Sequence, residues 1–212
     1  VGSPAPAAVD LSVDVDTEIP KGKEKRPFAI AGVIGTQKYA RQNRGIGDVK
    51  YAGRDAAMMK RYLIEVLGFE EKNIIYRTDV TSGDLRNIFG TRENLKGRLH
   101  NRLMPGESEV LPAKSLTVVL DACFSGDSPA GALFKDISPA TVKNMRAVQE
   151  VKNGVVFSSA DKDQVATWYP EKRHSLFTYF FLKGLGGAAD SDKNKQITAG
   201  ELKTYLARYV PF

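Results

Sequence analysis

One short segment holds the residues best suited to chemistry. The apolar run Leu116–Leu120 is typical of a strand buried on both faces. Asp121 and Cys123 follow it directly, and the turn Phe124-Ser125-Gly126 comes next. The chain's single cysteine is therefore expected at the carboxyl end of a strand, the edge at which open α/β sheets bind ligands. A thiol two residues after a carboxylate at such an edge is typical of a nucleophile. The alternative is a small buried thiol without a chemical role.

The elements that must position this thiol alternate between strands and helices. Apolar runs predict further strands at 28–35, 73–76 and 154–159. Helical spacing of apolar residues predicts helices at 55–67, 82–89, 91–104, 175–185 and 201–209. This alternation favours an α/β fold with a mostly parallel central sheet and helices on both faces.

Composition bounds the class of protein. A length of 212 residues suits one domain, and shares of 42% hydrophobic and 26% charged residues are those of a soluble globular protein. No apolar run approaches the roughly 20 residues that a membrane-spanning helix needs. We therefore expect a soluble protein without a membrane span, either cytoplasmic or periplasmic and secreted. One cysteine excludes an internal disulfide.

The charge is basic but spread along the chain. The net charge is +6, and the one cluster, Lys21–Arg26, contains an acid and no aromatic residue. A nucleic-acid-binding stripe would gather basic residues on one face, so we expect no nucleic-acid partner. Residues 1–26, of which the first eight include Gly, Ser, Pro and Ala, are predicted to be a flexible leader and linker. The folded domain is then expected at 27–212.

The segment Leu116–Gly126 resembles the cysteine motif of the caspase-like peptidases, the superfamily of caspases, metacaspases and their bacterial relatives. Further likeness covers segments similar to the first strand, the acid-bearing loop and the late strand and helix of bacterial members: Phe28–Gly35, Tyr51–Ala56, Gly154–Gln164 and Ser175–Gly184. The resemblance implies a three-layer caspase-like fold. It also implies a cysteine endopeptidase with Cys123 as nucleophile, acting on peptide or protein substrates with no cofactor required for the chemistry.

The resemblance also implies a substrate preference. In metacaspase-type members, an acid two residues before the cysteine helps bind a basic P1 side chain, and a second acid does so from the opposite side. Asp121 and Asp55 match these positions, so cleavage after Arg or Lys is expected. For Asp55 the alternative is a helix N-terminal acid, favoured by the helix dipole. Ser158, Ser159 and Asp161, at the end of the late strand, are further candidates for lining the cleft.

The general base of the family is missing from its usual place. There it is a histidine in a Ser-Gly-His-Gly turn, at the end of the strand before the cysteine strand, and this chain has no such turn. His100 falls on a predicted helix, and His174 falls at the start of another. We hypothesise that a segment with that strand and turn is absent at the Val110–Leu111 junction. The alternative is a catalytically inactive relative that serves as a binding or regulatory module.

A second constellation resembles a calcium loop of the EF-hand type. Six residues fall at loop positions 1, 3, 5, 7, 9 and 12, and these are Asp190, Asp192, Asn194, Gln196, Thr198 and Glu201. Lys195 stands where the sharp turn of such loops favours glycine. Without metal, Thr198 and Glu201 are explained equally well as a capping box for the last helix. Calcium is thus one possible ligand of this loop, and a polar capped turn is the alternative.

Overall fold

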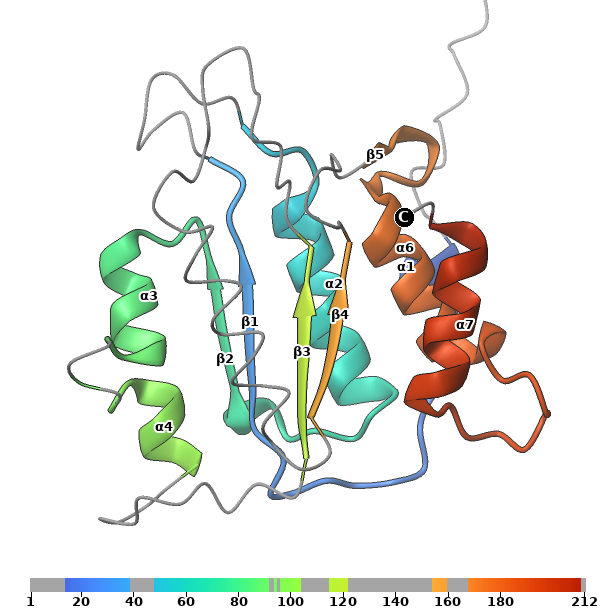
Figure 1. Ribbon diagram of the computed structural model, residues 1–212, viewed down its shortest axis with the longest axis horizontal. Coiled ribbons are helices and arrows are strands. Elements are labelled where there is room, and N and C mark those ends of the chain that lie inside the picture. The colour runs from blue at the N-terminus through green and yellow to red at the C-terminus, as the bar shows by residue number, and fades with distance from the viewer. Residues whose placement is uncertain are drawn as a thin grey trace, which may run out of the picture.

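Two parallel strand pairs form the centre of the computed structural model, which describes residues 14–38, 48–91, 94, 96–103, 115–121, 154–159 and 168–210 (Figure 1). The strands are β1 (Ala31–Gly35), β2 (Ile74–Thr78), β3 (Leu116–Leu120) and β4 (Gly154–Ser158). β1 pairs with β2 in parallel, and β3 pairs in the same way with β4. Among these residues no ladder joins the two pairs. The expected α/β class and parallel pairing are confirmed, but the described strands form separate two-stranded sheets and not one continuous sheet.

A short antiparallel hairpin was not predicted from the sequence. It consists of β5 (Trp168–Tyr169) and β6 (His174–Ser175), joined by a 3₁₀ turn at Pro170–Lys172. Arg173 closes the turn with a left-handed φ of 53°. The hairpin leads directly into the helix that follows β6.

Five of the described helices overlap predicted ones: α2 (Ala52–Glu65), α3 (Ser82–Phe89), α4 (Arg98–Leu103), α6 (Leu176–Lys183) and α7 (Ala199–Tyr209). A further short helix, α1 (Asp14–Thr17), was not predicted. A π turn, Gly184–Ala188, continues α6, and a 3₁₀ turn, Glu71–Asn73, precedes β2. None of the helices in the described ranges is long and apolar enough to cross a bilayer.

The helix predicted at 91–104 is shorter than expected, because its first part forms a turn. The amide of Asn94 donates to the hydroxyl of Thr91, and the amide of Thr91 donates to the carbonyl of Asn94. Thr and Asn side chains compete in this way with helical hydrogen bonds. In the described residues the helix therefore begins only at Arg98.

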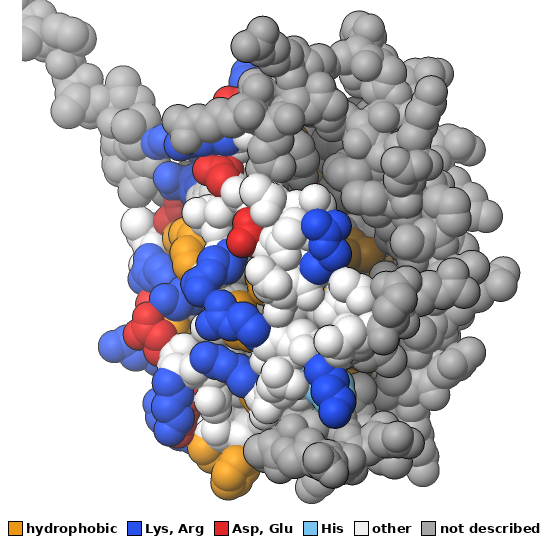
Figure 2. Space-filling view, turned by 90° about the vertical axis from the view of Figure 1, so that its left-hand side faces the viewer, with side chains coloured by type: hydrophobic (Ala, Val, Ile, Leu, Met, Phe, Trp, Pro, Cys, Tyr) orange, Lys and Arg blue, Asp and Glu red, His pale blue; other side chains and the backbone are white. Residues whose placement is uncertain are grey.

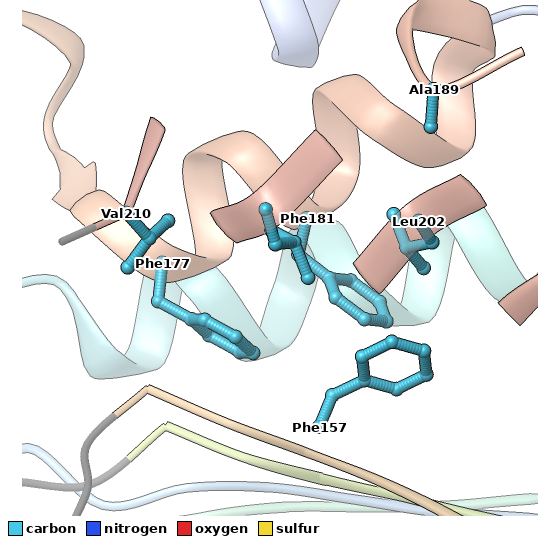
Figure 3. Close-up of a cluster of buried hydrophobic side chains, with 7 residues drawn as sticks. Phe157, Phe177, Phe181, Ala189, Leu202 and Val210 are labelled. Atoms are coloured by element: carbon cyan, nitrogen blue, oxygen red, sulfur yellow. The ribbon is translucent and has the colours of Figure 1, made fainter. Parts of the chain in front are cut away.

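α6 is the central helix of the core. On one side Phe177 and Phe181 pack with Phe157 of β4, and the rings of Phe157 and Phe181 meet edge to face at 5.5 Å between centroids (Figure 3). On the other side Tyr179 and Leu182 pack against α2. Because α6 is buried on both sides, the backbone at its start is held in a fixed position relative to β4 and α2.

The N-terminal segment is packed onto this core over part of its length. Within the range 1–26, for which we expected a flexible leader, α1 places Val15 at 3% exposure against Tyr62 and Leu182. The Tyr62 hydroxyl donates to the Val15 carbonyl at 3.0 Å. Further along, the amide of Gly22 donates to the carbonyl of Glu65 at 2.8 Å. This segment is therefore part of the folded domain from Asp14 onward.

Charged side chains of both signs cover the surface beside β2. Figure 2 shows Lys and Arg over this face, with Asp and Glu among them. One of the ion pairs joins Lys60, whose ammonium group lies over the Tyr76 ring of β2, to Glu71 at 2.6 Å. Water screens such exposed pairs, so they do not determine the fold.

Candidate active site

One serine links the two acids that the sequence predicts for the substrate pocket. Ser175 is the N-cap of α6 and accepts a hydrogen bond from the amide of Thr178. Its own amide donates to Oδ2 of Asp55 at 3.1 Å, and its hydroxyl donates to Oδ2 of Asp121. The Thr178 hydroxyl donates to the same Asp121 oxygen at 2.6 Å. Asp55 and Asp121, far apart in sequence, therefore belong to one polar cluster.

Asp121 and the predicted serines lie at the carboxyl ends of neighbouring strands. Asp121 follows the last residue of β3, and Ser158 ends β4 opposite Leu120. The amide of Ser159 donates to the carbonyl of Leu120 at 2.9 Å. Asp121 is exposed, whereas Ser159 is buried. Cys123, the predicted nucleophile, lies outside the described residues, as do Asp161 and the Val110–Leu111 junction.

Asp55 lies at a helix N-terminus, in the first turn of α2, and also contacts the cluster around Asp121. Only 8% of Asp55 is exposed. Burial raises the pKa of Asp55, and the hydrogen bond with His174 opposes this effect. Asp55 is thus a buried acid with both oxygens engaged, and Asp121 is the acid that faces solvent.

His174 lies at the bottom of the same cluster and is fully buried. Its Nδ1 is hydrogen-bonded to Oδ1 of Asp55, and its Nε2 lies 3.0 Å from Oδ1 of Asp16 in α1. Each ring nitrogen of His174 therefore faces a carboxylate oxygen. An imidazole engaged at both nitrogens has no free site to accept a proton from a thiol. The histidine of this cluster is therefore a structural partner of the acids.

The other histidine is also separate from this cluster. His100 lies on α4, which packs against α3, and no hydrogen-bond partner for its Nδ1 is found within the described residues. A cavity of about 440 Å³ lies beside these helices, lined by Arg77, Asp84, Asn87, Ile88 and Arg98. None of the predicted site residues lines this cavity, so it is not the candidate active site.

Asp14, the other acid of α1, is held by side chains of the hairpin turn and of α6. Asp14 accepts hydrogen bonds from Lys172 at 3.2 Å, Lys183 at 3.0 Å and the Tyr179 hydroxyl at 2.9 Å. Burial by itself would raise the pKa of Asp14, but the bonds from Lys183, Tyr179 and Lys172 outweigh it and lower the pKa to about 2. Nothing local in the sequence marks Asp14 or Asp16 as members of this cluster, because their partners lie more than 150 residues away along the chain.

The lowered pKa of Asp14 predicts a pH-dependent contribution to stability. A carboxyl group with a folded-state pKa below its unfolded value stabilises the fold above about pH 4, and this contribution is lost as the pH falls toward 2. We expect Asp14→Asn to lower the free energy of unfolding by about 1 kcal/mol at pH 7, after allowance for solvent screening, and by much less at pH 2.5. Urea unfolding at the two pH values measures this difference, with Glu18→Gln as an exposed control. An equal loss at both pH values would contradict the assignment.

The loop before α7 forms the capped turn that the sequence offered as the alternative to a metal site. The Thr198 hydroxyl accepts from the amide of Glu201 at 3.2 Å, and Oε2 of Glu201 accepts from the amide of Thr198 at 3.0 Å. These bonds, with those from Ser191, lower the pKa of Glu201 to about 2. Lys195 adopts a left-handed φ of 67°, the conformation that glycine would supply in an EF-hand loop.

Three carboxylates of this loop lie close together. Ligand oxygens of Asp190, Asp192 and Glu201 lie within 4.8 Å of one another. Asp190 accepts from the amides of Asn194 at 3.1 Å and Lys195 at 2.8 Å. The side-chain oxygen of Asn194 accepts from the amide of Gln196 at 2.7 Å. Calcium binding at this loop therefore stays a prediction, and the cap and the metal site share Glu201.

Calcium titration of the Glu201→Gln variant separates the two explanations. Glutamine retains the capping box, whereas it removes the charged ligand at loop position 12. We expect the wild type to bind one calcium ion weakly, with a dissociation constant on the order of 10⁻⁴–10⁻³ M, and the variant to lose this binding. Isothermal titration calorimetry measures both, with the exposed Glu171→Gln as the matched control. If the wild type gives no binding heat at millimolar calcium, the loop is only a capped turn.

Comparison of the chain with protein-family models, with curated proteins and with solved structures found no match. Function is therefore inferred from the residues and their geometry.

Proposed function

We propose that this chain is a caspase-like cysteine endopeptidase with a three-layer caspase-like fold, which cleaves peptide bonds after Arg or Lys with Cys123 as nucleophile. The observation that carries the proposal is the position of Asp121. It follows β3 directly, precedes Cys123 by two residues and shares a hydrogen-bonded cluster with Asp55. A thiol next to an exposed carboxylate at a sheet edge has the chemistry that such a peptidase needs.

The proposal gives Asp121 and Asp55 different roles in the P1 pocket. Asp121 is exposed, so its carboxylate is free to form a charge-assisted hydrogen bond with the guanidinium or ammonium group of a P1 side chain. Asp55 is buried and paired with His174. It supports the pocket by holding the amide of Ser175, whose hydroxyl in turn holds Asp121. A substrate with Asp at P1 would meet the same negative charge and be rejected.

The chemical step requires groups beyond this cluster. The thiolate of Cys123 attacks the scissile carbonyl carbon, and the amide of Cys123 is a natural donor to the resulting oxyanion. We hypothesise that the intact protein carries a further segment between Val110 and Leu111, that a histidine of this segment is the base, and that a glycine amide beside it is the second oxyanion donor. The activity proposed here is that of the protein with this segment. His174 does not serve as the base, because carboxylates engage both of its nitrogens.

A peptide library with varied P1 residues tests the proposed specificity. We expect Arg and Lys to be preferred over all other residues at P1, and Asp to be among the poorest. Cleavage preferentially after Asp would overturn the assignment of Asp121 and Asp55 to the pocket.

A second candidate function is a catalytically inactive relative that binds peptides with basic residues. It is favoured by the full engagement of His174, because the described residues then offer no base near Asp121. Such a protein would bind an Arg-containing peptide through the same acids without hydrolysing it. Hydrolysis that depends on Cys123 distinguishes the two functions.

A further inference from the structure

A continuous chain of hydrogen bonds joins the N-terminal segment to the predicted pocket. It passes from Asp16 to His174, from His174 to Asp55, from Asp55 to Ser175 and from Ser175 to Asp121. His174 is 0%, Ser175 7% and Asp55 8% exposed, and the Asp16 side chain is 10% exposed. Buried polar groups depend on their partners for compensation, so a change at one end of the chain affects the other.

The segment that supplies Asp16 is anchored on both sides of that residue. Val15 packs into the core, and Asp14 pairs with Lys172 and Lys183. The carboxylate of Asp16 also contacts Arg54, and its carbonyl accepts from Arg61 at 3.0 Å. Three consecutive residues of this segment are therefore held by the core: Asp14 by two lysines, Val15 by apolar and aromatic side chains, and Asp16 by Arg54 and His174.

We propose that Asp14–Thr17, here called the strap, regulates the candidate active site, and that Asp16 is a positioning residue for the P1 pocket. This inference rests on the proposed function. Asp16 itself does not contact the substrate. It contacts Nε2 of His174 and fixes the ring, and Nδ1 of His174 holds Asp55 in the orientation that accepts the amide of Ser175. With the strap docked, Ser175 presents its hydroxyl to Asp121.

Release of the strap weakens this arrangement because it removes the partner of a buried ring nitrogen. Without Asp16, Nε2 of His174 loses its hydrogen-bond partner, so the ring is held at one nitrogen and not at two. Asp55, which contacts Nδ1 of that ring, then holds the amide of Ser175 less firmly, and the position of Asp121 becomes less defined. A docked strap therefore favours binding of a basic P1 residue, and an undocked strap disfavours it.

Two alanine variants of the full chain test the role of Asp16. Asp16→Ala removes the contact with His174, whereas Asp14→Ala removes ion pairs of the same strap and leaves that contact in place. With an Arg peptide, we expect Asp16→Ala to raise KM by about tenfold while kcat changes less than about twofold, because only binding at P1 is weakened. Asp14→Ala loosens one anchor of the strap but keeps the Asp16–His174 contact, so it is expected to raise KM by less than about threefold. Asp16→Glu, which keeps the charge, is expected to restore much of the binding.

A readout that needs no peptidase activity keeps the test independent of the proposed function. Hydrogen–deuterium exchange of a peptide that spans residues 172–178 reports on the Ser175 amide. We expect about tenfold faster exchange in Asp16→Ala and less than about threefold faster exchange in Asp14→Ala, which keeps the contact with His174. If no protein hydrolyses peptides but exchange behaves in this way, the proposed function fails and the coupling through His174 stands. If the two variants have the same exchange, and the same KM where activity is present, Asp16 has no special role and the inference is wrong.

Discussion

Replacement of Asp121 by alanine is expected to lower kcat/KM for a peptide with Arg at P1 by about 10²–10³. Asp121 is the solvent-facing acid of the cluster, so its loss removes the charge-assisted contact with the guanidinium group. Truncation of one partner of a charge pair that the bound substrate buries costs about 2–5 kcal/mol, or about 30- to 5,000-fold, and the expected loss falls within these limits. Steady-state kinetics of the variant and the wild type measure the effect.

Two controls test whether the loss in Asp121→Ala is specific to substrates with a charged P1 residue. A peptide with a neutral P1 residue is expected to lose less than about fivefold, because it makes no charged contact in the pocket. The exposed Glu24→Ala, far from the cluster in the sequence, is expected to behave as the wild type with both peptides. Ser175 and Thr178 lose an acceptor in Asp121→Ala, so thermal unfolding must show that the variant is folded at the assay temperature. An equal loss for the charged and neutral peptides would mean that Asp121 supports the structure without binding P1.

Replacement of His174 by alanine is expected to lower the free energy of unfolding by about 3–5 kcal/mol. His174 lies fully buried between the carboxylates of Asp55 and Asp16, so its removal leaves a cavity and takes a hydrogen-bond partner from each acid. A cavity and buried polar groups without partners are among the few causes of a loss this large. Urea unfolding of the variant measures the loss, and His100→Ala on α4 is the matched control, with an expected change under about 1 kcal/mol.

The same variant tests whether His174 is the general base. A base that acts on the thiol would leave stability nearly unchanged when lost and would reduce kcat by orders of magnitude. His174→Gln, which retains a donor, is expected to be more stable than His174→Ala and to retain whatever peptidase activity the wild type has, corrected for the folded fraction. A stable His174→Gln without activity would contradict the structural role assigned here.

Local sequence patterns predicted the elements that short-range physics determines. β3 and α3 have the predicted bounds, because a run of apolar residues and a Thr81–Asp84 capping box define them within a few residues. α2 begins at Ala52, three residues before the predicted start at Asp55, because Tyr51 takes a left-handed φ of 67° and opens the helix earlier. The separation of the strands into two pairs has no local signature, since pairing joins residues distant in sequence.

The candidate site was predictable only in part for the same reason. The resemblance to caspase-like peptidases indicated Asp121 and Asp55, and the structure places both around Ser175. A serine before an apolar helix is a recognisable N-cap, so Ser175 carried a local signal that predicted its structural role but not its contacts with the two acids. Asp16 carried none, because only the folding of the N-terminal segment onto α2 and α6 brings it to His174.

Hydrolysis of a fluorogenic Arg peptide, compared between the wild type and Cys123→Ala, tests the central claim most directly. We predict release of the fluorophore by the wild type and none above background by Cys123→Ala, while both proteins have the same thermal unfolding temperature. Turnover that persists in Cys123→Ala would contradict a cysteine nucleophile. A folded wild type that binds the Arg peptide without cleaving it would contradict the peptidase and favour the inactive binding module.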